Sequence, residues 1–217
     1  MSRPVLTIGN RNYSSWSMRP WLALKWGGID FDTRIIELGP DGGHRNERIS
    51  PFSPTGLVPV LQLGDDSIWD SLAICEWAAE QNPSLLPQDP VVRAICRSTC
   101  AEMHAGFVLV RRDLSMNIRR RTEPRELSPE TAAQVARIDA LWSQCFNRFG
   151  GPFLFGAAPT LADAMFAPVA TRFRTYGITL SPTAQSWCDV IFADGAFKEW
   201  EAEAIAEEWV IEKTDAA

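Results

Sequence analysis

A strand passes into a helix at residues 5–26, which read VLTIGNRNYSSWSMRPWLALKW. Val5–Ile8 is apolar and rich in β-branched residues, which is typical of a strand with both faces buried. The polar run Asn10–Ser15 follows as a turn, and the pattern predicts a helix over Ser17–Trp26, closed by Gly27-Gly28. A second strand is predicted over Phe31–Leu38, and strands that flank a helix are normally parallel.

The rest of the first half continues to alternate between strand and helix signals. The elements expected there, in order, are a turn at Pro40–Gly43, a short irregular or helical stretch to Ser50, a strand over Val58–Leu63, a hairpin turn at Gly64–Asp66, a strand over Ser67–Trp69 and a helix over Ser71–Gln81. The order β-α-β-α-β-β-α predicts an α/β domain over residues 1–82, in which the last two strands form an antiparallel hairpin.

The second half has only helical signals. Residues 83–90 contain three prolines and are expected to be a linker. The helices expected beyond it are Val91 to about Arg121 (one long helix, straight or bent), Pro129–Phe149 (the clearest amphipathic one), Thr160–Tyr176, Pro182–Phe192 and Ala196–Ala206. Residues 91–217 are therefore expected to form an all-α helical bundle.

Charge and composition exclude several classes of function. The net charge of −6 repels a phosphate backbone, so no nucleic-acid partner is expected. No apolar run is long enough to cross a bilayer and no secretory signal opens the chain, so we expect a cytoplasmic protein without a membrane partner. The five cysteines form no Cys-x-x-Cys pair, so neither a disulfide framework nor a zinc site is expected. The two histidines, His44 and His104, lack acidic partners at the spacing of a metal site.

Two constellations near predicted helix starts carry chemistry. The first is the run from Asn12 to Arg19, in which a serine hydroxyl can hydrogen-bond to a thiolate and lower its pKa. The second is Asp70-Ser71, where free N–H groups suit a carboxylate and Asp70 can pair with an ammonium group. Each pattern has a structural alternative, because serine and aspartate are also ordinary N-caps.

Two further motifs are a proline at the start of a predicted strand and a capping box at the start of a predicted helix. A proline that opens an internal strand cannot donate to the ladder, and a cis Val58-Pro59 bond would explain it by turning the backbone of Val58 toward a ligand. An ordinary trans proline is the alternative. Thr160 and Asp163 have the form of a capping box, which we interpret as structural.

These four motifs, in this order, resemble the cytosolic glutathione transferases over roughly Val5 to Phe197. The resemblance implies a thioredoxin-like first domain that holds glutathione and a helical second domain that supplies the pocket for the second substrate. The run Ser14-Ser15-Trp16-Ser17 is most similar to the zeta class, which carries Ser-Ser-Cys there. Because Trp16 replaces that cysteine, the similarity argues for a zeta-like relative of different specificity.

The resemblance also implies the roles of individual residues. The thiol-activating hydroxyl would be that of Ser14, with Ser15 assisting. The glutathione contacts it implies are Val58 ahead of a cis Pro59 (cysteinyl backbone), Asp70 and Ser71 (γ-glutamyl end), and His44 or Arg45 (glycyl carboxylate). The expected residues around the second substrate are Trp16, Phe107, Arg111 and either Arg172 or Arg174, of which Arg174 is the one we select.

The function expected from this resemblance is attack of the glutathione thiolate on a small electrophile, in a homodimer, with glutathione as co-substrate and no metal. The absence of cysteine before Cys75 fits this, because the reactive sulfur must then arrive with the ligand. Two alternatives stay open. One is a glutathione-dependent cis-trans isomerase of the maleylacetoacetate type, and the other is a non-catalytic binding protein with the same fold.

Overall fold

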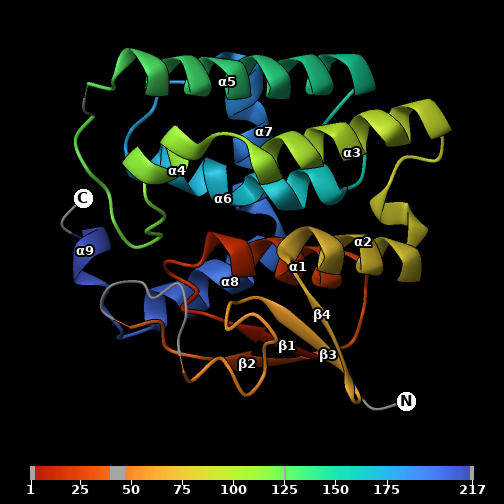
Figure 1. Ribbon diagram of the computed structural model, residues 1–217. Helices are drawn as coiled ribbons and strands as arrows, with labels where there is room; N and C mark the ends of the chain where they lie inside the picture. Colours follow the sequence, from red (N-terminus) through yellow and green to blue (C-terminus); the bar gives the residue numbers. More distant parts are fainter. Residues whose placement is uncertain (1–2, 40–46, 125, 216–217) are drawn as a thin grey trace.

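The computed structural model describes residues 3–39, 47–124 and 126–215 of the 217-residue chain. A small sheet lies at one end of the molecule and a stack of helices at the other, with α1 (Ser15–Trp26) and α2 (Ser71–Gln81) between them (Figure 1). These two helices cover the face of the sheet that is turned toward the helical part, so the start of α1 faces the second half of the chain.

The sheet has four strands in the order β2-β1-β3-β4. Their bounds are Val5–Ile8 (β1), Asp32–Ile35 (β2), Val60–Leu63 (β3) and Asp66–Trp69 (β4). The prediction that the first two strands are parallel is confirmed, with Val5 opposite Asp32, and so is the antiparallel hairpin of the last two. The α/β character of the first half is therefore confirmed.

The connection between β2 and β3 differs from the expectation of a second helix. The described residues 47–52 form consecutive turns, and the part of this connection that the structure describes contains no helix. The turn predicted at Pro40–Gly43 lies outside the described residues. A run with two prolines, Pro51 and Pro54, gives little scope for helical hydrogen bonding, because proline lacks the N–H that a helix interior needs.

The second half is helical, as predicted. The elements are the 3₁₀ helix η1 (Pro83–Leu85), α3 (Pro90–Ala105), α4 (Val108–Asp113), α5 (Pro129–Phe149), α6 (Leu161–Thr175), α7 (Pro182–Ala193), α8 (Gly195–Ala206) and the short α9 (Glu212–Asp215). The helix predicted over Pro129–Phe149 has those bounds in the structure, and Gly150 closes it in the left-handed conformation.

The prediction of one helix from Val91 to about Arg121 is wrong. The chain leaves α3 at Gly106, which is extended, and Phe107 takes a left-handed conformation with φ 55° before α4 begins. Helix α4 ends at Asp113, and the chain that follows is irregular although Leu114, Met116 and Ile118 are buried. Burial here is provided by contacts with other elements, which a helical periodicity does not reveal.

One hydrophobic core joins the two halves. Helix α6 is buried on almost every side, and the ring of Trp142 on α5 packs against Phe166, Phe173 and Trp187 at centroid distances of 5.7, 5.6 and 4.3 Å. The same core cluster contains Leu6 of β1 and further residues of α1 and α2. The start of α1 is thus set in a rigid junction between the sheet and α6.

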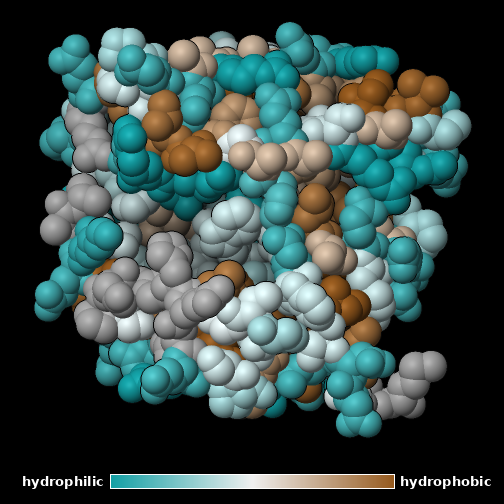
Figure 2. All heavy atoms as spheres, viewed as in Figure 1, coloured by the Kyte–Doolittle hydropathy of each residue, from teal (hydrophilic) through white to brown (hydrophobic). Residues whose placement is uncertain are grey.

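The surface is mainly hydrophilic on the face viewed in Figure 1. Figure 2 shows apolar side chains there as small separate patches rather than one continuous area. Over the whole surface, the large apolar side chains that are exposed include Leu57, Trp69, Val91 and Val108. Among the described residues, we find no helix with the length and apolar character that spanning a membrane requires.

Candidate functional site

Helix α1 begins with the capping serine that the sequence suggested as an alternative. Ser14 is the N-cap, and its Oγ accepts the backbone N–H of Ser17 at 3.4 Å. The Ser14 hydroxyl also donates its own proton to the Oγ of Ser17 at 2.7 Å. Ser17 in turn accepts the N–H of Gly9 at 3.1 Å. The hydroxyl of Ser14 is therefore occupied by the local hydrogen bonds that start the helix.

The neighbouring Ser15 has a different environment. It is 4% exposed, and its Oγ accepts a hydrogen bond of 2.9 Å from Nη2 of Arg172. Arg172 lies on α6, and its Nη1 donates to the carbonyl of Leu114, which directly follows α4, at 2.5 Å. Within the described part of the chain, the proton of the Ser15 hydroxyl has no acceptor. Ser15 is thus a buried hydroxyl that receives from a cation and can still donate.

Arg172 belongs to a group of three arginines, since the charges of Arg111 and Arg172 both act on Arg19. Arg19 on α1 is 1% exposed, and its Nε and Nη1 have no hydrogen-bond partner among the described residues. Burial, together with the positive charges of Arg111 and Arg172, lowers the pKa of Arg19 to about 9. Burial also lowers the pKa of Arg172, to about 10, and that of Arg111. In the regions described, none of these three guanidinium groups forms an ion pair, so the cluster suits an anion.

Trp16 connects these cations to the start of α2. The guanidinium carbon of Arg19 lies 4.2 Å from the centre of the Trp16 ring, and that of Arg111 lies 5.4 Å from it. The ring of His104 on α3 packs against Trp16 edge-on at 5.5 Å. His104 Nε2 in turn lies 3.4 Å from the carboxylate of Asp70. The indole therefore forms a wall shared by the cationic cluster and the Asp70 end of the site.

The start of α2 carries a cap and an unsatisfied hydroxyl. Asp70 is the N-cap with φ 73°, and its Oδ1 accepts the N–H of Leu72 at 2.8 Å. Ser71 is 1% exposed, and its Oγ has no partner in the part of the chain described here. The predicted cis bond between Val58 and Pro59 is confirmed, directly before β3.

Several predicted residues lie elsewhere or cannot be placed. Arg174 pairs with Glu201, and its guanidinium lies 4.1 Å from the Phe192 ring, so it faces α7 and α8 and not Ser15. Phe107 is 6% exposed and packs on Phe166 in the core at 6.2 Å. The predicted glycyl-carboxylate residues, His44 and Arg45, lie outside the described residues.

His104 and Arg19 lie in this cluster, but neither was predicted from the sequence as a site residue. His104 was considered only as a metal ligand, and nothing in its spacing indicates contact with Trp16. Arg172 and Arg174 are two positions apart on α6, where they face different sides. The apolar run that precedes both arginines does not show which of them is buried against α1.

Tyr13 precedes Ser14 and also carries a hydroxyl, but that hydroxyl already both donates and accepts hydrogen bonds within the protein. It donates to the carboxylate of Asp215 at 3.0 Å, and Nη2 of Arg119 donates to it at 3.0 Å. Of the hydroxyls at the start of α1, that of Ser15 is the one whose surroundings favour donation to an anionic ligand.

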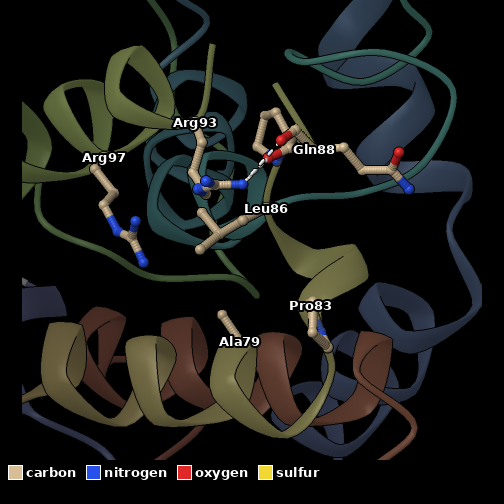
Figure 3. Close-up of a pocket in the computed structure, with 7 residues that line it drawn as sticks. Ala79, Pro83, Leu86, Gln88, Arg93 and Arg97 are labelled. Atoms are coloured by element: carbon tan, nitrogen blue, oxygen red, sulfur yellow. Dashed lines mark hydrogen bonds between the residues drawn. The ribbon is translucent and has the colours of Figure 1, made fainter. Parts of the chain in front are cut away.

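Two cavities lie away from this cluster. One of about 330 Å³ lies between α2, η1 and α3, where Figure 3 shows Arg93 pointing to the carbonyl of Gln88, its hydrogen bond measuring 2.9 Å. The other, of about 290 Å³, is lined by Arg11, Trp21 and residues of α8. Neither is lined by a residue that the sequence singled out for ligand chemistry. In the described residues, no group of three histidine, cysteine or acidic side chains could hold a metal ion.

Comparisons with known proteins match both halves of the chain. The profile of the glutathione S-transferase N-terminal domain matches residues 13–81, and that of the glutathione S-transferase C-terminal domain matches residues 126–204. Maleylacetoacetate isomerase of Rattus norvegicus is 31% identical over 183 residues, covering 83% of this chain and 82% of the relative. Maleylpyruvate isomerase of a Ralstonia species is 27% identical, covering 78% of this chain and 85% of the relative.

Solved structures are similar over the same extent. A holo maleyl pyruvate isomerase, described as a bacterial zeta-class glutathione S-transferase, has a TM-score of 0.72 at 22% identity, covering 94% of this chain and 99% of the other. A theta-class glutathione S-transferase of Xanthomonas axonopodis pv. citri, solved with glutathione bound, has a TM-score of 0.67 at 25% identity, covering 94% of this chain and 100% of the other. The predicted fold is thereby confirmed.

Proposed function

Because the chain belongs to the glutathione S-transferase family, we propose that it binds glutathione and uses the ionised thiol against a small electrophilic substrate. The observation that carries this proposal is the contact between Ser15 and Arg172. A hydroxyl that accepts from a cation becomes a stronger donor, because hydrogen bonds in a chain polarise one another. It is placed at the start of α1, where the helix N-terminus also favours an anion.

The proposed chemistry begins with ionisation of the glutathione thiol. A free thiol has a pKa near 8.5, and a hydrogen bond to the thiolate together with nearby cations lowers that value. Ser15 would donate to the sulfur, while the charge of Arg172 and the unpartnered nitrogens of Arg19 stabilise the negative charge. This assigns the main role to Ser15 and a capping role to Ser14, in place of the order expected from the sequence.

Glutathione binding would use the features around Val58 and the start of α2. The buried hydroxyl of Ser71 and the free N–H groups of α2 suit the carboxylate of the γ-glutamyl end, and Asp70 suits its ammonium group. The backbone of Val58, ahead of the cis bond, would pair with the cysteinyl part. His44 or Arg45 remains the proposed partner of the glycyl carboxylate.

A second candidate function is favoured by the arginine cluster. Three guanidinium groups without ion pairs in the described regions suit a substrate that carries carboxylates. In an isomerase the thiolate adds to one carbon of a conjugated cis double bond, whose electron pair moves onto the adjoining carbonyl. Rotation follows about the new single bond, and loss of the thiolate restores the double bond as trans. The relatives named as isomerases support this candidate.

The test compares the two reactions directly. The purified protein is assayed with glutathione and an aryl halide for conjugation, and with glutathione and a cis-enone diacid for isomerisation. If the arginine cluster selects the substrate, isomerisation of the diacid is the faster reaction. Binding of glutathione without either activity would favour a non-catalytic protein and would contradict the proposal.

We also propose that the protein is a cytoplasmic homodimer, as expected from the sequence. Exposed apolar side chains such as Trp69 and Val108 offer area for a subunit contact. Light scattering coupled to size-exclusion chromatography would give twice the chain mass if this is correct, and the mass of one chain if it is wrong.

A further inference from the structure

Residues 207–215, called the C-terminal strap here, contact the loop that leads into Ser14. The carboxylate of Glu207 accepts two consecutive backbone N–H groups of that loop, from Arg11 at 2.7 Å and from Asn12 at 3.1 Å. These groups lie almost the whole chain apart in sequence. A carboxylate that accepts two amides fixes the orientation of both peptide planes, because each bond is directional.

The far end of the strap holds the next residue of the loop. The carboxylate of Asp215 accepts the hydroxyl of Tyr13 at 3.0 Å and Nδ2 of Asn117 at 2.6 Å. Arg119 links Tyr13 to the first residues of the strap, since its guanidinium donates to Tyr13 Oη, to the carbonyl of Glu207 and to the carbonyl of Trp209, the last at 2.8 Å. The strap is thus bound to the loop by side-chain groups at both of its ends.

A buried apolar contact accompanies these bonds. Ile211, in the middle of the strap, is 2% exposed and belongs to a small cluster with Tyr13, Leu38 and Ile49. Val58, proposed to bind glutathione, packs against the edge of the same cluster. The strap therefore contacts the surroundings of both the Ser14-Ser15 pair and the backbone proposed to bind glutathione.

The loop is also held by the chain after α4. Asn12 is fully buried, its Nδ2 donates to Asn117 Oδ1 at 3.0 Å, and its Oδ1 accepts the N–H of Arg119 at 2.9 Å. Helix α1 starts two residues after Tyr13, so the loop has little freedom left once both segments hold it. Fixing the loop fixes where the hydroxyl of Ser15 points.

We propose that the C-terminal strap is a positioning element for thiol activation, in which Glu207 and Asp215 act through the loop on Ser15. The inference rests on the proposed function, since it assigns the strap a role in that same chemistry. Glu207 and Asp215 touch no reacting atom in this account. Their effect is to hold the hydroxyl in the orientation that ionises bound glutathione.

The test uses Glu207→Gln in the full chain, with Glu208→Gln as the matched control because Glu208 is the exposed neighbour. The amide of glutamine keeps one acceptor oxygen but places a donor toward one of the two N–H groups. We expect the amides of Arg11 and Asn12 to exchange hydrogen about tenfold faster. We also expect the pKa of the bound thiol to rise by about one unit, so that kcat near pH 6.5 falls about tenfold with little change in KM for glutathione.

The outcomes separate this inference from the proposed function. If the wild-type protein ionises bound glutathione and Glu207→Gln does so equally, the strap has no positioning role although the proposed function stands. Faster amide exchange with an unchanged thiol pKa also overturns the inference, because it describes a purely structural contact. If the wild-type protein fails to ionise glutathione, the proposed function fails and the inference fails with it.

A second pair of variants covers the other end of the strap. Tyr13→Phe and Asp215→Ala remove the two partners of one hydrogen bond, so a shared positioning effect predicts that the double variant loses no more kcat than the stronger single variant. Independent losses that add in the double variant would overturn the inference for Asp215.

Discussion

At the residue scale, the site depends on a neutral hydroxyl that shares a buried position with cations. Ser15 alone is an ordinary first-turn residue, and the chemistry proposed for it depends on Arg172, which lies 157 positions later in the sequence. The serine pair could be predicted from the sequence because the motif is local. The prediction selected Arg174 over Arg172, since only packing against α7 and α8 or against α1 distinguishes the two.

Arg172 offers a direct residue-scale prediction. Lysine keeps the charge, but its three N–H groups leave one nitrogen, whereas Arg172 donates to Leu114 and Ser15 from two separate nitrogens of a planar group. Lysine therefore does not reproduce both hydrogen bonds. We expect Arg172→Lys to lower kcat/KM by about tenfold to a hundredfold. The matched control is Arg174→Lys, for which steady-state kinetics should stay within about twofold of wild type. Equal losses in the two variants would contradict the assignment.

The cysteines give a second prediction, with a defined pH dependence. All five are buried, and burial raises the pKa of the Cys75 and Cys188 thiols and brings that of Cys145 to about 11. A raised thiol pKa keeps the unreactive protonated form at every pH below it. We expect no reaction of the folded protein with Ellman's reagent between pH 7 and pH 9, and five equivalents after unfolding in guanidinium chloride. A fast-reacting thiol in the folded protein would show that an enzyme thiol competes with glutathione.

At the scale of elements, helix starts were the best predicted features and helix ends in α3 and α4 the worst. The start of α2 and both ends of α5 were found from capping residues and apolar periodicity, which are local signals. The break at Gly106 and Phe107 was missed, because the residue that carries the left-handed conformation is a phenylalanine. Its ring is buried against Phe166, and this tertiary contact outweighs the backbone preference.

The predicted capping box at the start of α6 is present and supports a stability prediction. The buried carboxylate of Asp163 accepts four hydrogen bonds, from the N–H groups of Leu154 and Thr160, the hydroxyl of Thr160 and Nε1 of Trp187. In Asp163→Asn an NH₂ group would face two of these donors. We expect a loss of about 2–4 kcal/mol in the free energy of unfolding, seen as a Tm lower by roughly 5–15 °C.

The control for that variant lies on the surface of α7. Asp189→Asn removes a charge whose carboxylate accepts from Gln185 in an exposed position, so its Tm should stay within about 1 °C of wild type. Differential scanning calorimetry measures both. A loss no larger in Asp163→Asn than in Asp189→Asn would contradict the structural role of the box.

At the scale of the whole molecule, the chain has two halves of different composition but one continuous core. We propose the boundaries 1–82, 83–90 and 91–217 for the first domain, linker and second domain, as the sequence indicates. The contact between them is extensive, since α1 packs against α6 and α8, and the rings of Trp21 and Trp200 meet at 5.3 Å. Contacts of this kind cannot be predicted when the sequence of each half is considered alone.

The shared core predicts cooperative unfolding. We expect a single thermal transition, with equal calorimetric and van't Hoff enthalpies, because neither half buries its apolar face without the other. Trp200→Phe, which removes an indole from the junction, should lower the Tm of that single transition. Two separable transitions, of which the variant moves only one, would show that the halves unfold independently.

The central claim is that the start of α1 ionises a thiol that glutathione carries in, with Ser15 as the donor. Ultraviolet difference titration of the bound thiolate tests it most directly, in the wild-type protein and in Ser15→Ala. We predict a thiol pKa at least about one unit below the free value in the wild-type protein and a return to about 8.5 in the variant. An equally low pKa in Ser15→Ala would contradict the account.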